Sequence, residues 1–215
     1  MINSAFINIW GKRAGAIAWD PDTGFATFEY SPSFVGQNLE LAPLKMPVEA
    51  DSTIFSFPEF AGNTTFKGLP GLLADVLPDR YGNALINTWL AQQGRPADSM
   101  NPVEMLCFIG KRGMGALEFE PVQPKSANTT TKIELDSLVD ITRQILGNRE
   151  GFETDLSKDE HKALMDILKV GTSAGGARAK AIIAYNTATG EVRSGQAEAP
   201  EGFTYWLIKF DGIED

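Results

Sequence analysis

The chain has 215 residues, of which 43% are hydrophobic and 22% are charged. This composition is typical of a folded protein of one or two domains and argues against extensive disorder. The formal net charge is −9, which argues against nonspecific nucleic-acid binding because such binding needs clustered Lys and Arg. Any contact with DNA would therefore require a basic partner.

The few cysteines and histidines also restrict the function. Cys107 is the only cysteine and lies in an apolar run, 105–109, so we interpret it as a core residue of a reduced, cytoplasmic protein. His161 is the only histidine and lies in a polar segment, which makes a catalytic triad or a histidine-rich metal site improbable. No signal sequence and no apolar run of roughly 20 residues is seen, so no membrane partner is expected.

Three segments at the start of the chain alternate between apolar and polar residues, as half-buried strands do. They span residues 5–10, 14–19 and 25–30. Turn-forming residues lie in both gaps, Gly11-Lys-Arg in the first and Asp20-Pro-Asp-Thr-Gly24 in the second. Short connections of this kind join neighbouring antiparallel strands, so the sequence predicts an antiparallel meander.

Helical spacing follows from residue 69. Apolar residues at 69–77 share one face, Pro78 interrupts the pattern, and it resumes over 85–90 before Gly94 and Pro96 end it. Asp79 and Arg80 are expected to cap the second part and to pair there, and we interpret the whole segment as structural.

A third helix should begin after Asn101 as N-cap, with Pro102 in its first position, and end at Gly110. Four tryptophans fall within predicted strands or helices and are core candidates: Trp10, Trp19, Trp89 and Trp206.

The rest of the chain predicts a second part. Residues 115–121 resemble a short edge strand, and a Pro-, Ser-, Asn- and Thr-rich stretch at 123–132 resembles a linker. Amphipathic helices are predicted at 134–146 and 157–168. The predicted fold class is α+β, with a β-rich N-terminal subdomain with helices over 1–122 and a smaller antiparallel sheet with helices over 133–215.

A glycine-rich turn, Gly171-Thr-Ser-Ala-Gly-Gly-Ala-Arg-Ala-Lys180, is the first candidate for chemistry. Glycines let backbone N–H groups approach phosphate oxygens, and Thr172, Ser173, Arg178 and Lys180 add hydroxyl donors and charge. Its spacing fits neither the Walker pattern nor the G-x-G-x-x-G of ordinary protein kinases. On local sequence alone, a simple connection between a helix and a strand at 181–185 remains open.

Lys209 is the second candidate. It lies in an almost wholly apolar predicted strand, 203–210, which should be buried on much of both faces. A buried ammonium requires a carboxylate or a bound phosphate nearby. The turn at 186–190 would let the strands 181–185 and 203–210 join one sheet, giving a glycine-rich cover with a strand lysine beneath it, as in a kinase N-lobe. The alternative is an amine at a strand end that extends into water.

The chain as a whole resembles the HipA-type serine/threonine kinases, the toxins of bacterial toxin–antitoxin modules. Residues 66–82 are similar to the family's N-terminal signature, F-x-GLP-x-x-x-x-D-x-LPD-x-x-G. Residues 110–121 are similar to its G-x-x-x-x-GAL-x-F-x-P strand. Residues 171–180 together with Trp206-Leu-Ile-Lys209 resemble its nucleotide loop and ATP-contacting lysine.

The resemblance implies roles for individual residues. Those lining the ATP phosphates would be Gly175, Gly176, Ala177, Arg178, Ala179 and Lys180, with Lys209 contacting the phosphates directly. Ser173 matches a position that is autophosphorylated in the family and thereby switches the kinase off, because a dianionic phosphate there would repel those of ATP. This chain has Arg178-Ala-Lys where the family's best-known form has Gln-Glu-Lys, which leaves the role of Arg178 open.

The resemblance also implies a cofactor, ATP with Mg²⁺. Phosphoryl transfer needs an aspartate to orient the substrate hydroxyl, and Asn and Asp ligands for Mg²⁺. In this family those residues lie in a C-terminal helical lobe, and Asp211 and Asp215 follow the lysine strand too closely to replace them. We therefore expect an N-terminal part of such a kinase, with a partial N-lobe, no catalytic or metal-binding residue and no activity alone.

Two function classes follow, besides an α+β fold with no active site. In the first, the parent protein is a kinase toxin whose partners are a DNA-binding antitoxin of the HipB type and a protein substrate, typically an aminoacyl-tRNA synthetase. DNA would be contacted only through the antitoxin. In the second, residues 1–121 form a noncatalytic module that docks an antitoxin or a kinase lobe. Weak ATP binding by this chain, and stronger binding by a version extended past Asp215, would favour the first.

Overall fold

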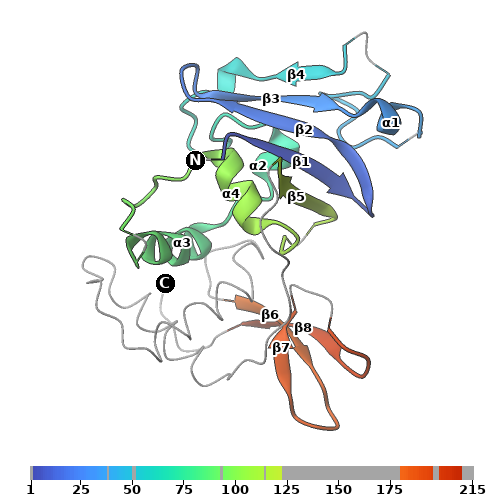
Figure 1. Ribbon diagram of the computed structural model, residues 1–215, viewed down its shortest axis with the longest axis vertical. Coiled ribbons are helices and arrows are strands. Elements are labelled where there is room, and N and C mark those ends of the chain that lie inside the picture. The colour runs from blue at the N-terminus through green and yellow to red at the C-terminus, as the bar shows by residue number, and fades with distance from the viewer. Residues whose placement is uncertain are drawn as a thin grey trace. The chain divides into compact units, whose positions relative to one another are not determined.

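The computed structural model describes residues 2–37, 39–49, 52–92, 94–113, 115–122, 180–195 and 199–209. These residues form a mixed α+β structure with two antiparallel sheets (Figure 1). They fall into two compact units. The first contains the chain up to residue 77 together with residues 100–122, and the second contains residues 78–99 together with the strands from residue 180 onward. The predicted linker, the helices predicted at 134–146 and 157–168, and His161 lie outside the described residues.

The first unit is built on a five-stranded antiparallel sheet in the order β4-β3-β2-β1-β5 (Figure 1). Its strands are β1 (Ser4–Ile9), β2 (Lys12–Asp20), β3 (Phe25–Tyr30), β4 (Ile54–Ser56) and β5 (Leu117–Pro121). The predicted meander and the predicted edge strand are both confirmed. The three-residue strand β4 was not predicted, because a segment this short carries too little alternation to be recognised.

The turn between β1 and β2 explains how that hairpin forms. Trp10 and Gly11 both have positive φ, 48° and 73°, which is the geometry of the two-residue turns that match the twist of paired strands. Lys12 and Arg13, expected in the turn, belong to β2 instead. Trp10 is 70% exposed at this tip, so its interpretation as a core residue is wrong.

Short helices complete the first unit: α1 (Pro32–Val35), a 3-10 helix (Pro58–Phe60), α2 (Gly71–Ala74) and α4 (Pro102–Ile109). The prediction for α4 is confirmed at both ends. The Asn101 side chain accepts a hydrogen bond from the Glu104 backbone N–H at 2.8 Å, as an N-cap residue does. Gly110 follows the helix with φ 59° and donates its N–H to the Leu106 carbonyl.

The core of the first unit lies on one face of the sheet, where α2 and α4 pack against it (Figure 1). Alternate strand residues point toward these helices, as a half-buried antiparallel sheet requires. Fully buried side chains include Ile7, Ile17, Phe28, Tyr30, Phe34, Leu69, Leu73 and Phe119. The Tyr30 hydroxyl donates to the Met46 carbonyl at 2.8 Å, so the polar end of the largest fully buried side chain is satisfied.

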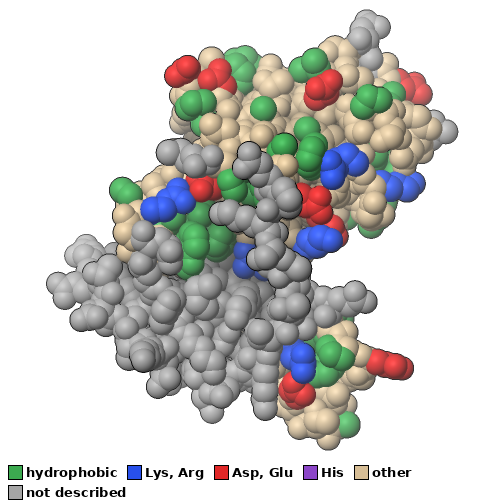
Figure 2. Space-filling model, viewed as in Figure 1, with side chains coloured by type: hydrophobic (Ala, Val, Ile, Leu, Met, Phe, Trp, Pro, Cys, Tyr) green, Lys and Arg blue, Asp and Glu red, His purple; other side chains and the backbone are tan. Residues whose placement is uncertain are grey.

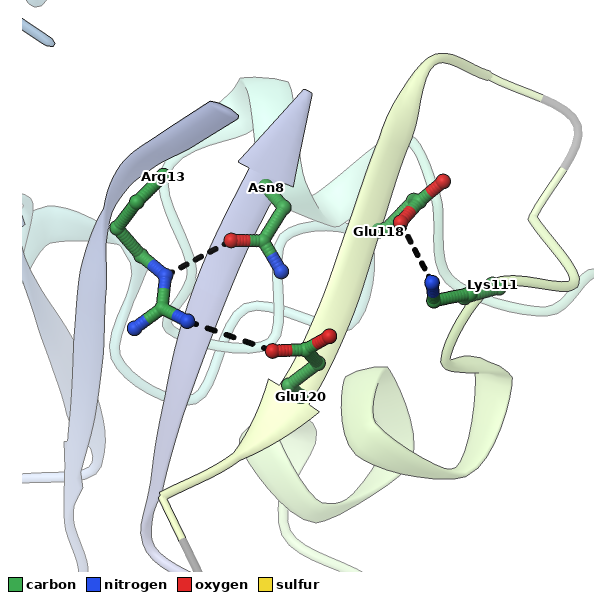
Figure 3. A network of polar contacts seen from close by, with 5 residues as sticks. All are labelled: Asn8, Arg13, Lys111, Glu118 and Glu120. Atoms are coloured by element: carbon green, nitrogen blue, oxygen red, sulfur yellow. Dashed lines mark hydrogen bonds and ion pairs between the residues drawn. The ribbon is translucent and has the colours of Figure 1, made fainter. Parts of the chain in front are cut away.

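The opposite face of the sheet carries ion pairs (Figure 3). Arg13 donates from Nε to Asn8 Oδ1 at 2.8 Å, and its Nη2 lies 3.4 Å from Glu120 Oε2. Its guanidinium also lies over the Phe6 ring, 3.7 Å from the centroid. Lys111 Nζ lies 3.5 Å from Glu118 Oε2. These contacts link β1, β2 and β5 on the side away from the core.

The second unit combines α3 (Arg80–Gln92) with a three-stranded antiparallel sheet in the order β7-β6-β8. Its strands are β6 (Lys180–Tyr185), β7 (Val192–Ser194) and β8 (Thr204–Lys209). The predicted helix after Pro78 and the two predicted strands are confirmed. The turn at 186–190 leads from β6 into β7 rather than directly toward β8, and β7 was not predicted.

Candidate functional site

The structure describes only part of the predicted phosphate site. Ser173, Gly175, Gly176, Ala177, Arg178 and Ala179 lie outside the described residues. Lys180 is the first residue of β6, and Lys209 is the last residue of β8. The candidate site is therefore built from these two lysines and the groups around them.

The pairing of β6 with β8 brings the two lysines together. The strands are antiparallel, and Lys180 is the direct partner of Lys209 in their register. Residues directly opposite each other project from the same face of a sheet. Two ammonium groups therefore share one face at the same end of this strand pair. Like charges placed in this way repel, and an anion near both would relieve the repulsion.

The burial that the sequence predicts for Lys209 is wrong. Lys209 is exposed, whereas Lys180 is only 8% exposed. The expectation that β8 is buried on much of both faces is wrong, since Tyr205, Trp206 and Leu207 are 53%, 54% and 47% exposed. The interpretation of Trp206 as a core residue is therefore also wrong. The argument that a buried ammonium needs a partner applies to Lys180 instead.

The position of β8 in its sheet accounts for this exposure. Among the described residues it pairs with β6 alone, so it lies at the edge of the sheet that these residues form. The polar atoms of its aromatic side chains form hydrogen bonds with residues nearby in the sequence. Trp206 Nε1 donates to Thr204 Oγ1 at 2.9 Å, and the Tyr205 hydroxyl accepts from the Ala199 N–H at 2.9 Å. An apolar run in a sequence indicates a strand but does not say how many of its sides are covered.

Lys180 is held by a carboxylate that the sequence did not identify as its partner. Lys180 Nζ lies 3.6 Å from Asp79 Oδ2, and the two side chains are 8% and 15% exposed. Asp79 also caps α3, because its Oδ1 accepts the Gly82 N–H at 2.9 Å. The predicted capping role of Asp79 is thus confirmed, whereas the ion pair it forms is with Lys180 and not with Arg80. A pair formed between residues so far apart in the chain leaves no local signal in the sequence.

The first half of the segment 66–82 has a structural explanation. Gly68 has φ +74°, and a Cβ at this position would collide with the Gly24 carbonyl oxygen and the Phe25 backbone. Its carbonyl accepts the Ala26 N–H at 2.8 Å, which ties the segment to the start of β3. Leu69 and Leu73 then fill the core of the first unit. The structural interpretation therefore holds for this half, while the Asp79 end adds a charged contact.

The segment 110–121 is also structural. Gly110 ends α4, and its carbonyl accepts the Phe119 N–H at 3.1 Å, which sets the start of β5 against the helix end. Phe119 is buried in the core. Glu118 and Glu120 project from the other face and form the ion pairs of Figure 3.

The first unit contains a separate apolar pocket with a volume of about 460 Å³. One wall is formed by Phe57, Phe60 and Phe66, whose rings are stacked with centroid separations of 5.6 and 4.0 Å. The turn at 42–46 forms another wall, and Leu44 at its tip is 92% exposed. A volume of this size lies within the range of pockets that hold small ligands or partner side chains.

The described residues show few other candidates for chemistry. On the face seen in Figure 2, acidic and basic side chains of the first unit are interspersed, and no continuous basic patch is visible there. Cys107 packs against the core, and burial raises its pKa to about 11, which agrees with its interpretation as a core residue. Within the described ranges, no three His, Cys, Asp or Glu residues are placed to hold a metal ion, and no helix is long and apolar enough to cross a membrane.

Comparison with known protein families gives a match to the HipA N-terminal domain over residues 5–120. This range covers more than half of the chain and includes the signature at 66–82 and nearly all of the strand motif at 110–121. No curated protein matches the sequence significantly. Nearly all of the first unit, together with helix α3, lies within the matched range. The chain belongs to the HipA N-terminal domain family.

Proposed function

We propose that this chain supplies the phosphate-holding part of a HipA-like, ATP-dependent serine/threonine kinase toxin. The observation that carries the proposal is the register of β6 with β8, which places Lys180 and Lys209 opposite each other on one face. A glycine-rich segment at 171–180 leads directly into the first of these lysines. In this arrangement the small sheet is the counterpart of a kinase N-lobe.

Lys180, Lys209 and the glycine-rich segment are suited to bind an anion with several negative charges. Each ammonium can donate three hydrogen bonds, and two of them side by side can contact different phosphates of one nucleotide. Backbone N–H groups of Gly175 and Gly176, with Ala177, Arg178 and Ala179, would donate further hydrogen bonds to the phosphates. ATP would bind with Mg²⁺, which neutralises charge on the transferred phosphate. We assign its ligands to the helical lobe that the family resemblance implies, outside the described residues.

Ser173 gives the proposal a regulatory element. It lies within the same glycine-rich segment, two residues before Gly175. A phosphate on its hydroxyl would carry nearly two negative charges and would compete with ATP for the same lysines. We propose that its autophosphorylation switches nucleotide binding off.

The proposal is tested with the product of the complete gene and the variants Lys209→Ala and Lys12→Ala. Lys12 is an exposed strand lysine in the first unit, which makes it a matched control. We expect Lys209→Ala to abolish autophosphorylation and to weaken ATP binding at least tenfold, while Lys12→Ala leaves both intact. A complete gene product that binds no ATP, or a Lys209→Ala variant that still autophosphorylates, would falsify the proposal.

A second candidate function rests on the apolar pocket of the first unit. Three stacked phenylalanines beside an exposed Leu44 are suited to bury an apolar side chain of a protein partner. In this alternative the family domain acts as a docking module, with a DNA-binding antitoxin of the HipB type as the partner. DNA would then be contacted through the antitoxin, and an aminoacyl-tRNA synthetase would be the substrate of the kinase.

The docking alternative is tested by Leu44→Asp, which places a charge at the pocket without removing a core side chain. We expect this variant to weaken the binding of the antitoxin encoded beside the gene by tenfold or more, with ATP binding unchanged. Ile54→Asp, at an exposed position of β4, is the control. Equal antitoxin affinity for both variants and the unchanged chain would rule the pocket out as the docking site.

A further inference from the structure

The ion pair between Asp79 and Lys180, in the second unit, has no part in the proposed function as stated so far. Its nitrogen and oxygen lie 3.6 Å apart, and both side chains are largely buried. Asp79 belongs to the Leu-Pro-Asp part of the segment 66–82, whereas Lys180 ends the glycine-rich segment. One end of the family signature is therefore in contact with the last residue of the predicted phosphate loop.

The first turn of α3 fixes the position of the Asp79 carboxylate. Its Oδ1 accepts the Gly82 N–H at 2.9 Å. The Asn83 side chain donates to the Pro78 and Asp79 carbonyls at 2.8 and 2.9 Å, and the Asn83 N–H also donates to the Asp79 carbonyl. The backbone and the side chain of Asp79 are both held, so the carboxylate is a fixed point and the long side chain of Lys180 adapts to it.

The ion pair also offsets the repulsion between the two lysines that the strand register brings together. Lys180 and Lys209 face each other across β6 and β8, so their positive charges repel each other. The Asp79 carboxylate compensates the buried member of the pair. Among the described residues of the second unit, Arg80 beside Asp79 is exposed, and Arg193 of β7 pairs with Glu191 at 2.9 Å. Asp79 is thus an acidic partner of Lys180 within the described part of the second unit.

We infer that Asp79 is a positioning residue of the phosphate site. By holding Lys180 Nζ and compensating its charge, it presents that ammonium beside Lys209, so that both can contact the phosphates of one nucleotide. The inference rests on the proposed function, because it concerns how the same two lysines are arranged. It gives the Pro78-Asp79 step a role in nucleotide binding as well as in starting α3.

A merely structural role for Asp79 makes a different prediction. If Asp79 only caps α3 and stabilises the fold, its removal lowers the affinity for ATP and for adenosine to the same extent. If it positions Lys180 on the phosphates, its removal lowers the affinity for ATP and leaves that for adenosine unchanged. The comparison of the two ligands therefore separates positioning from folding.

The experiment measures ATP and adenosine binding by the complete gene product carrying Asp79→Asn, Asp79→Glu or Lys180→Ala. Asp75→Asn, an exposed aspartate of the same segment, is the matched control. We expect Asp79→Asn to weaken ATP binding about tenfold or more, by analogy with the loss that follows removal of a group that orients a metal-ligating side chain. Adenosine binding should not change, and Asp79→Glu should recover part of the ATP affinity by restoring the charge.

The outcomes separate this inference from the proposed function. If the unchanged protein binds ATP and Lys180→Ala weakens that binding while Asp79→Asn does not, Asp79 is not a positioning residue and the proposed function stands. Equal losses for ATP and adenosine in Asp79→Asn, with unchanged thermal stability in Asp75→Asn, assign Asp79 to the fold alone. If the unchanged protein binds no ATP, both proposals fail together.

Discussion

The two units of the chain use their ion pairs in different ways. In the first unit, Arg13 and Glu120 pair on the outer face of the sheet with side chains 39% and 44% exposed. In the second unit, Lys180 and Asp79 pair with side chains only 8% and 15% exposed. Exposed pairs contribute little to stability, whereas a buried pair is costly to form and strongly destabilising to break on one side. A buried pair therefore calls for a reason beyond stability, and we propose that the phosphate site is that reason.

A core substitution in the first unit should give the largest loss of stability, against which the effects of the two ion pairs can be compared. Phe28 is fully buried and packs edge-on against Tyr30, with ring centroids 4.8 Å apart. We expect Phe28→Ala to lower the free energy of unfolding by about 3–5 kcal/mol, because it removes buried area and leaves a cavity. Urea unfolding gives the value, and Ile54→Ala at an exposed position serves as control. A loss below about 1 kcal/mol would show that packing on this face is not what stabilises the unit.

The buried ion pair should show a large coupling energy. We expect a double-mutant cycle with Asp79→Asn and Lys180→Met to give about 1–3 kcal/mol of interaction energy, because each single change leaves a buried group uncompensated. The cycle is measured by chemical unfolding at neutral pH. Strict additivity of the two substitutions would mean that the groups do not interact, and the contrast between the units would disappear.

Tyr30 gives the first unit a dependence on alkaline pH. Burial, with a smaller contribution from the charge of Glu40, raises the pKa of Tyr30 to about 12. Because this value lies above the usual 10, the unfolded chain loses its phenolic proton first, so stability is constant below about pH 10 and falls as the pH rises toward 12. We expect Tyr30→Phe to cost about 1 kcal/mol at neutral pH, through the lost bond to Met46, and to remove this pH dependence. Unfolding curves recorded between pH 8 and 12 test both effects, and an unchanged slope in the variant would contradict them.

The exposed ion pair should give the smallest effect. We expect the coupling between Arg13 and Glu120 to be about 0.2–1 kcal/mol and to decrease when salt is added. A cycle with Arg13→Gln and Glu120→Gln, run at low and high salt, provides the measurement. A coupling as large as that of Asp79 with Lys180 would remove the distinction on which the comparison rests.

Sequence patterns located most elements of the fold. Alternation identified β1 to β3, and local capping signals placed α4 between Asn101 and Gly110. Such features are local, so the sequence contains them. The three-residue strands β4 and β7 were missed because their formation depends on the neighbouring strand rather than on their own composition.

The candidate site was predicted less completely. The sequence identifies both lysines, but the burial it predicts for Lys209 is wrong, because an apolar run does not reveal whether a strand lies at a sheet edge. Asp79 was recognised as a helix cap, whereas its contact with Lys180 depends on how α3 and β6 pack within the second unit. Trp10 was assigned to the core although the left-handed turn directs it outward. In each case the missing information was how elements far apart in the sequence pack against each other and which side chains they leave exposed.

The most direct test of the central claim observes the lysine side chains while ATP binds. In protein labelled with ¹⁵N at the lysine side chains, the Nζ signals of Lys180 and Lys209 should shift together as ATP is added, and the Lys12 signal should not. Adenosine should leave all three unchanged, since it carries no phosphate. Shifts at other lysines with none at Lys180 and Lys209 would contradict the claim that these two residues hold the phosphates.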